Sequence, residues 1–119
     1  MAGSYRDLVA WQKSMKLAKL IYKATASFPS DERFGLTAQM RRAAVSIPSN
    51  IAEGQARFSK REFQHFLRNA KGSLAELETQ ITLAAELEFL KAEAAKELLR
   101  VCDEIGRILA GLLASLTAD

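Results

Sequence analysis

The chain has 119 residues, of which 49% are hydrophobic and 26% are charged, and its formal net charge at pH 7 is +3. This is the size and composition of one ordinary globular domain, which can bury a core without disulfides or metals. The single cysteine excludes an intramolecular disulfide framework. No apolar run approaches the roughly 20 residues of a membrane span, and the N-terminus lacks the apolar stretch of a signal peptide, so we expect a cytoplasmic protein.

The charge is divided unevenly along the chain. Residues 1–72 carry 13 Lys and Arg against 5 Asp and Glu, a balance of +8, whereas residues 73–119 carry 4 against 9, a balance of −5. The basic half can bind phosphate, and the acidic half can face either the basic half of another copy or only water. Composition alone leaves both possibilities open.

Hydrophobic periodicity predicts two helices in the first half. In the first, over about residues 7–27, the apolar face is formed at three- and four-residue steps by Leu8, Trp11, Met15, Ala18, Tyr22 and Thr25. Pro29 follows that segment, and proline favours an extended residue before it, so the helix ends there. A second pattern, over about residues 33–54, contains Pro48. We expect one helix that is kinked near Pro48 rather than two short helices.

Two further helices are predicted in the second half. Ser59 and Glu62 have the spacing of a capping box, which indicates the start of a helix over about residues 60–88. Apolar residues then step by four and three through three heptads, and the same spacing recurs over about residues 92–116. Four helices with short connections predict an all-α fold, an antiparallel up-down four-helix bundle that occupies residues 1–119 as one domain.

The apolar surface of the first and fourth predicted helices is wider than one core requires. Apolar residues of the fourth helix cover about half of its circumference, against the roughly 100° stripe of a helix that buries one face. Gly106 and Ala110 lie one turn apart and lack the bulk that would hold a neighbouring helix away. We therefore predict self-association through Leu17, Leu20, Ile21, Leu99, Gly106, Ala110 and Leu113. The alternative is that these residues cover one another within one subunit.

Basic residues form two candidate surfaces for nucleic acid. On the first helix, the lysines lie opposite the predicted apolar face, at Lys13, Lys16, Lys19 and Lys23. A second group belongs to the second and third helices and comprises Arg41, Arg42, Arg57, Lys60, Arg61, Arg68 and Lys71. Such side chains neutralise phosphates and release counterions, so binding would tolerate many sequences and weaken with salt. The alternative for both groups is the solvated face of an amphipathic helix.

No pattern points to catalysis or to a metal site. His65 is the only histidine, and no cluster of His and Cys accompanies it, so we expect no metal and no other cofactor. Cys102 falls on the apolar seam of the fourth helix and is interpreted as a small buried hydrophobe.

The polar residues around Pro48 are assigned structural roles. Asn50 and the neighbouring serines are expected to satisfy backbone groups that Pro48 frees, and Glu53 is expected to pair with Arg42 or with a neighbouring subunit. Gly54 closes the second helix and belongs to the same structural group.

Seven segments resemble one protein family. They are YRDLVAWQ at residues 5–12, FP at 28–29, FGL at 34–36, QMRRAAVSI at 39–47, SNIAEG at 49–54, GSLAELE at 72–78 and the leucine-rich residues 112–116. Over nearly the whole chain they resemble the four-helix-bundle proteins encoded in 23S rRNA intervening sequences. The resemblance implies a homopentameric barrel of antiparallel bundles and no agreed enzymatic activity. It also implies kinship with the accessory variability proteins of diversity-generating retroelements, basic pentamers that engage nucleic acid and a reverse transcriptase.

Two functions therefore stay open at this point. The leading hypothesis is a non-enzymatic homo-oligomer, a pentamer by resemblance, that binds RNA or DNA through a basic surface. The alternative is a protein-interaction scaffold or accessory subunit, for example for a polymerase, that does not bind nucleic acid directly. The uneven charge of the chain suits both.

Overall fold

Local signals in the sequence set where the helices begin. The structure is a computed structural model in which residues 4–117 are described. At the start of the third long helix, the Ser59 hydroxyl accepts a hydrogen bond from the Glu62 amide at 3.3 Å, so the predicted cap is confirmed. At the start of the second, Glu32 Oε1 accepts from the Leu36 amide at 2.9 Å. A Cβ on Gly35 would lie 2.8 Å from that carboxylate oxygen, so the Glu32 side chain would have to shift to admit one.

Four α-helices and two short 3₁₀ segments make up the described residues, and no strand occurs among them. In chain order the elements are η1 (Tyr5–Asp7), α1 (Val9–Thr25), η2 (Ser30–Glu32), α2 (Leu36–Ala56), α3 (Lys60–Glu86) and α4 (Ala92–Thr117). The four predicted helices match these bounds to within three residues, and the all-α fold is confirmed. None of the helices within residues 4–117 is long and apolar enough to cross a membrane.

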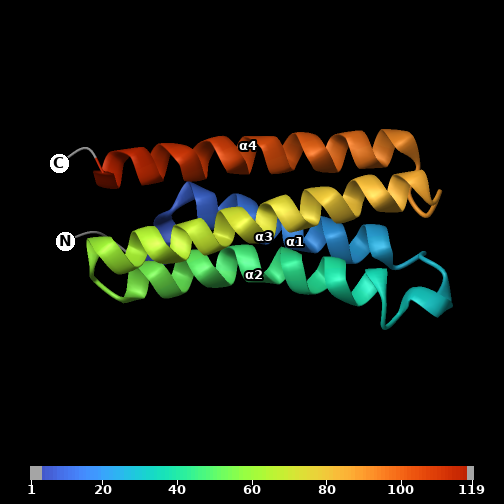
Figure 1. The fold of residues 1–119 in the computed structure, drawn as a ribbon, viewed down its shortest axis with the longest axis horizontal. Helices are drawn as coiled ribbons and strands as arrows, with labels where there is room; N and C mark the ends of the chain where they lie inside the picture. Colours follow the sequence, from blue (N-terminus) through green and yellow to red (C-terminus); the bar gives the residue numbers. More distant parts are fainter. Residues whose placement is uncertain (1–3, 118–119) are drawn as a thin grey trace.

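The helices form a bundle 46 Å long and 22 by 19 Å across, in which each one packs against two others. The pairs in contact are α1 with α2, α2 with α3, α3 with α4 and α4 with α1. Figure 1 shows α1 passing behind α3, between α2 and α4. Because α1 and α3 occupy diagonal corners, the faces that they turn to solvent point in opposite directions.

The buried face of α1 is rotated from the predicted one, although Ala18 and Thr25 are buried as predicted. Its buried residues are Ala10, Ser14, Leu17, Ala18, Ile21 and Thr25. Tyr22 is 46% exposed, and Trp11 and Met15 are only half-buried, so these three residues do not form the core as predicted. The aliphatic side chains occupy the centre of the bundle, whereas Trp and Tyr carry polar groups that favour its edge. The rotation of the helix places a line of apolar side chains at the surface, beside α2.

The packing of α1 and α4 differs from the predicted subunit interface. Leu17 and Ile21 are fully buried within one subunit, so they are not available to a neighbouring copy. Gly106 faces α3, since a Cβ on it would lie 3.5 Å from Leu74 Cδ2. Leu99 and Leu113 pack partly against the core, so much of the wide apolar arc is shared between neighbouring helices of the same bundle. Leu20 and Ala110 are exposed.

Pro48 lies inside α2, which continues as one helix through it. The bend there stays a prediction. Asn50 Nδ2 donates to the Ser46 carbonyl at 2.8 Å and to the Ser46 hydroxyl at 2.9 Å, and that hydroxyl also bonds Ser73 Oγ of α3 at 2.8 Å. The carbonyl that loses its helical donor to Pro48 is that of Ala44, so the predicted role of Asn50 is wrong: it links α2 to α3 through Ser46.

Candidate nucleic-acid surface and an apolar groove

Arg41 is used to hold α1 against α2. Its Nε donates to Thr25 Oγ1 at 2.9 Å and its Nη2 donates to the Tyr22 carbonyl at 3.3 Å. The guanidinium also lies 4.5 Å from the centroid of the Tyr22 ring. Carbonyls in the last turn of a helix lack intrahelical donors, and a cation there is favoured by the helix dipole. Arg41 therefore caps the end of α1 and is only partly available to a phosphate.

Arg57 is the centre of the turn between α2 and α3. Its Nη2 lies 2.7 Å from Glu53 Oε2 and its Nη1 lies 3.1 Å from Glu62 Oε1, while its guanidinium sits 5.1 Å from the Phe66 ring centroid. The hydrogen bond to Glu53 is the main reason that the pKa of Arg57 is raised. Two carboxylates already neutralise this predicted phosphate ligand.

The predicted pairing of Glu53 with Arg42 is wrong. Glu53 pairs with Arg57 one turn later, whereas Arg42 Nη2 lies 3.6 Å from Glu76 Oε2 of α3. Glu53 and Arg42 are eleven positions apart on the same helix, a rise of about 16 Å, which is too far for a contact.

Lys13 is also engaged within the subunit. Its ammonium lies 2.8 Å from Glu104 Oε2 and joins α1 to α4. The hydrogen bond from Lys13 is the main reason that the pKa of Glu104 is lowered. This ion pair links the two helices, so Lys13 has a structural contact within the bundle.

Six of the predicted phosphate ligands are exposed and have no acidic partner among the residues that the structure describes. They are Lys16, Lys19 and Lys23 on α1 and Arg61, Arg68 and Lys71 on α3. Lys60 is exposed as well, and it has an interaction partner. Since α1 and α3 lie at diagonal corners, one subunit cannot present both groups to the same flat surface. Of the predicted group on the second and third helices, the three cations on α3 stay together and unpaired, as the three lysines on α1 also do.

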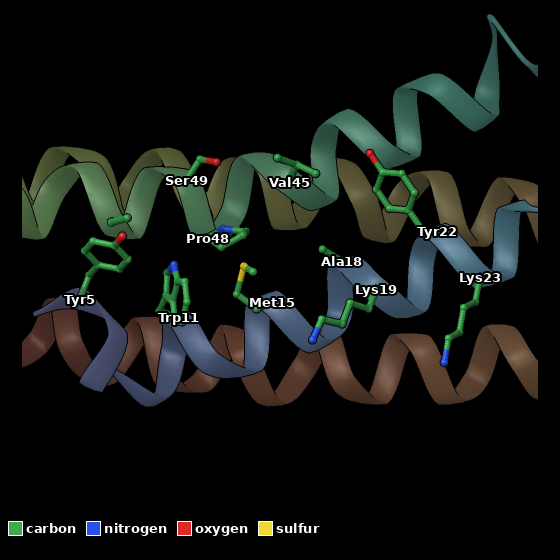
Figure 2. A pocket seen from close by; sticks show the side chains of 11 residues that line it. Tyr5, Trp11, Met15, Ala18, Lys19, Tyr22, Lys23, Val45, Pro48 and Ser49 are labelled. Atoms are coloured by element: carbon green, nitrogen blue, oxygen red, sulfur yellow. The ribbon is translucent and has the colours of Figure 1, made fainter.

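An apolar groove of 620 Å³ runs between α1 and α2 (Figure 2). The lining residues are Tyr5 of η1, Trp11, Met15, Ala18, Lys19, Tyr22 and Lys23 of α1, and Val45, Pro48, Ser49 and Ala52 of α2. The Tyr5 ring meets Trp11 edge-on at 5.3 Å between centroids. Figure 2 shows Trp11, Met15 and Pro48 projecting toward one another across the groove. Sequence analysis does not predict this groove, because it places Trp11, Met15 and Tyr22 in the core. The signal that could have indicated it is a second line of apolar residues on α1, which includes Leu17 and Ile21.

A second hollow continues the groove toward the start of α2. It has a volume of 500 Å³, shares Tyr22 and Val45 with the first, and is further lined by Arg33, Phe34, Thr37, Ala38, Arg41 and Arg42. Phe34, which lines this second hollow, is 87% exposed. We call the two hollows together the α1–α2 groove.

Neither the single cysteine nor the single histidine offers a reactive centre. Cys102 is fully buried, and burial raises the pKa of its thiol to about 12, so it is a protonated core residue, as predicted. His65 is exposed and lies 5.3 Å from the Phe66 ring. Within residues 4–117, no three His, Cys, Asp or Glu side chains lie together as metal ligands would.

Comparison with known proteins finds a solved structure with the same fold and a matching family model. The chain is similar to a protein of unknown function from Bacteroides thetaiotaomicron, assigned to the S23 ribosomal protein family, whose crystal structure superposes with a TM-score of 0.79 at 25% sequence identity. The match covers 88% of this chain and 98% of that one. No curated protein matches significantly. The family model described as 23S rRNA-intervening sequence protein matches residues 6–111, and the chain therefore belongs to that family.

Proposed function

We propose that this protein is a non-catalytic homo-oligomer that binds RNA or DNA through the exposed basic face of α3. The observation that carries the proposal is that Arg61, Arg68 and Lys71 are exposed, share one flank of the helix and have no acidic partner within the described chain. Arg61 and Arg68 are two turns apart, about 10 Å along the axis, which is a span over which successive phosphates of a strand can be reached.

Three cations per subunit give weak binding, so the proposal needs several copies. Each neutralised phosphate contributes counterion release, and linked copies of a weak site raise the overall affinity without any new contact. The pentamer that the family resemblance implies would bring together five copies of the α3 face. Because the contacts are to phosphate, binding would tolerate many sequences and would weaken steeply as salt rises.

The experiment is light scattering coupled to size exclusion, with and without a mixed-sequence RNA oligonucleotide, at low and at high salt. The test variant combines Arg61→Glu, Arg68→Glu and Lys71→Glu. Its matched control combines Lys16→Glu, Lys19→Glu and Lys23→Glu, which makes the same change in net charge on the diagonal helix. We expect a multimeric mass in all three proteins, and RNA co-elution at low salt that only the α3 variant loses. Equal loss in both variants, or binding that ignores salt, would contradict the proposal.

A second candidate function is the protein-interaction scaffold. The α1–α2 groove favours it, because an apolar surface of this kind is suited to another protein rather than to phosphate. A stable oligomer that does not bind RNA at low salt would favour the scaffold function.

A further inference from the structure

We propose that the α1–α2 groove binds one amphipathic helix of an acidic partner protein. This site lies apart from the α3 face and goes beyond the proposed function. Its occupant is inferred from the spacing of the lining residues, their exposure and their charge.

The spacing of the lining residues matches a docked helix. On α1 they follow the steps i, i+4, i+7 and i+11, from Trp11 through Met15 and Ala18 to Tyr22, a rise of about 16 Å. On α2, Val45, Pro48, Ser49 and Ala52 repeat at three- and four-residue steps along the facing side. Two helices with such rows leave between them the trough into which the side chains of a third helix fit. About 12 to 15 residues of helix would fill its length.

The groove exposes apolar surface that a partner would cover. Tyr22 is 46% exposed and Val45 is 42% exposed, while Trp11, Met15 and Ala52 are half-buried. These side chains are contiguous, unlike the single exposed leucines that are normal on a protein surface. Leucine-sized anchors entering this trough would remove the remaining apolar area from water.

The charge of the lining specifies the chemistry of the partner. Lys19, Lys23, Arg33, Arg41 and Arg42 line the two hollows, and no acidic residue does. Lys19 and Lys23 also lack an acidic partner within the described residues. A helix with Asp or Glu beside its apolar stripe would neutralise this edge, whereas a basic helix would be repelled.

Nucleic acid fits the groove less well than a helix does. Bases bind single-strand platforms by stacking on open aromatic faces. Here Arg41 lies 4.5 Å from the Tyr22 ring centroid, and Arg33 lies 5.1 Å from that of Phe34, so these two rings already carry a stacked cation. The middle of the groove is aliphatic, with Met15 and Pro48 at its centre (Figure 2).

This chain's own α4 is a poor occupant for a second copy's groove, because all its carboxylates except Glu93 in the first turn already have a basic partner. Glu97 pairs with Arg100, Asp103 with Arg107 and Glu104 with Lys13 of α1.

Trp11 supplies the readout, since it is the only tryptophan and lines the groove. The probe is a synthetic peptide of about 15 residues without tryptophan, with leucines at the i, i+4, i+7 and i+11 spacing and glutamates on both flanks. We expect a saturable blue shift of the Trp11 emission as the peptide is added to the full chain. A peptide of the same composition in scrambled order, and one with lysine in place of glutamate, should bind at least about tenfold more weakly.

Val45→Glu tests the site itself, because it places a carboxylate in the apolar lining at a position already 42% exposed. Leu83→Glu is the matched control, at 44% exposure on α3 and outside the groove. We expect Val45→Glu to weaken peptide binding at least about tenfold and Leu83→Glu to leave it unchanged. Circular dichroism of both variants confirms that they fold.

Three results would overturn the proposal. They are a scrambled peptide that binds as tightly as the ordered one, an RNA oligonucleotide that competes for the same Trp11 shift, and a Val45→Glu variant whose own mass falls, which would assign the groove to a second copy. Failure of this proposal is distinguishable from failure of the proposed function, because RNA binding is tested by variants of α3 and peptide binding by variants of the groove.

Discussion

Gly54 of α2 lies so close to Phe66 of α3 that a Cβ on residue 54 would be 2.7 Å from the Phe66 Cβ. The same Cβ would lie 3.0 Å from Phe63 Cδ1 and 3.4 Å from Phe63 Cα. Gly54 therefore allows the two helices to meet closely just before the Arg57 turn. It lies inside α2, which continues to Ala56, so it does not close the helix as predicted.

Gly54→Ala should destabilise the bundle. The added methyl must push α3 away, and overpacking of this kind costs about 1–3 kcal/mol, which exceeds the gain of about 1 kcal/mol from replacing glycine within a helix. Urea unfolding followed by circular dichroism, at one fixed protein concentration, measures the change. A variant as stable as the wild type would show that the helices separate here at no cost.

Gly72→Ala should have the opposite effect. Gly72 is exposed on α3, and nothing lies within 4 Å of the position that its Cβ would take. Alanine is the better helix former, so the variant should gain about 0.5–1 kcal/mol in the same unfolding experiment. A loss of stability would mean that another molecule approaches the backbone of α3 at Gly72 in the assembled protein, and the mass of the variant would then decrease.

Arg41→Ala should loosen the end of α1. The variant loses the bonds to Thr25 and Tyr22 together with the stacked cation, so we expect a loss of about 1–2 kcal/mol. Arg42→Ala is the natural control, because Arg42 is exposed and makes a 3.6 Å ion pair, for which less than about 1 kcal/mol is expected. Amide hydrogen exchange should rise in the last turn of α1 for Arg41→Ala alone.

Cys102 should make the protein sensitive to high pH. Its thiol has a pKa of about 12 in the fold because of burial, against a reference value of 9.0, so it stays protonated in the fold while it ionises in the unfolded chain. Its contribution to stability is therefore fully present below pH 9.0 and is lost as the pH rises toward about 12. Subtracting the unfolding profile of Cys102→Ala isolates this contribution from other groups. Native thiol labelling at pH 8 should proceed only as fast as the protein opens; immediate labelling would contradict a buried Cys102.

The elements that depend on local sequence could be predicted, as Ser59 shows. Its hydroxyl and the Glu62 amide are three residues apart, and the heptads after them fix α3 without reference to the rest of the chain. The pairing of Glu53 with Arg57 has the i, i+4 spacing of helical ion pairs and was also within reach of sequence reasoning.

The orientation of α1 could not be predicted in the same way. Trp11 and Tyr22 form one line at helical spacing, and Leu17 and Ile21 form another, so periodicity permits either line to be buried. The choice is made by α2 and α4, which pack on the two sides of α1. That packing creates the groove and buries Leu17 and Ile21, which were predicted at the interface. It also brings Arg41 within hydrogen-bond distance of Thr25, sixteen positions earlier in the chain.

Under the two proposals, the diagonal arrangement of α1 and α3 would give the chain two separate docking sides. A strand held on the outer face of α3 and a helix held in the α1–α2 groove would be separated by the thickness of a bundle that measures 22 by 19 Å in cross-section. Neither occupant would shield the other, so both could be bound in one ternary complex. The bundle itself would then act as a rigid spacer that sets how far a protein partner is kept from the nucleic acid.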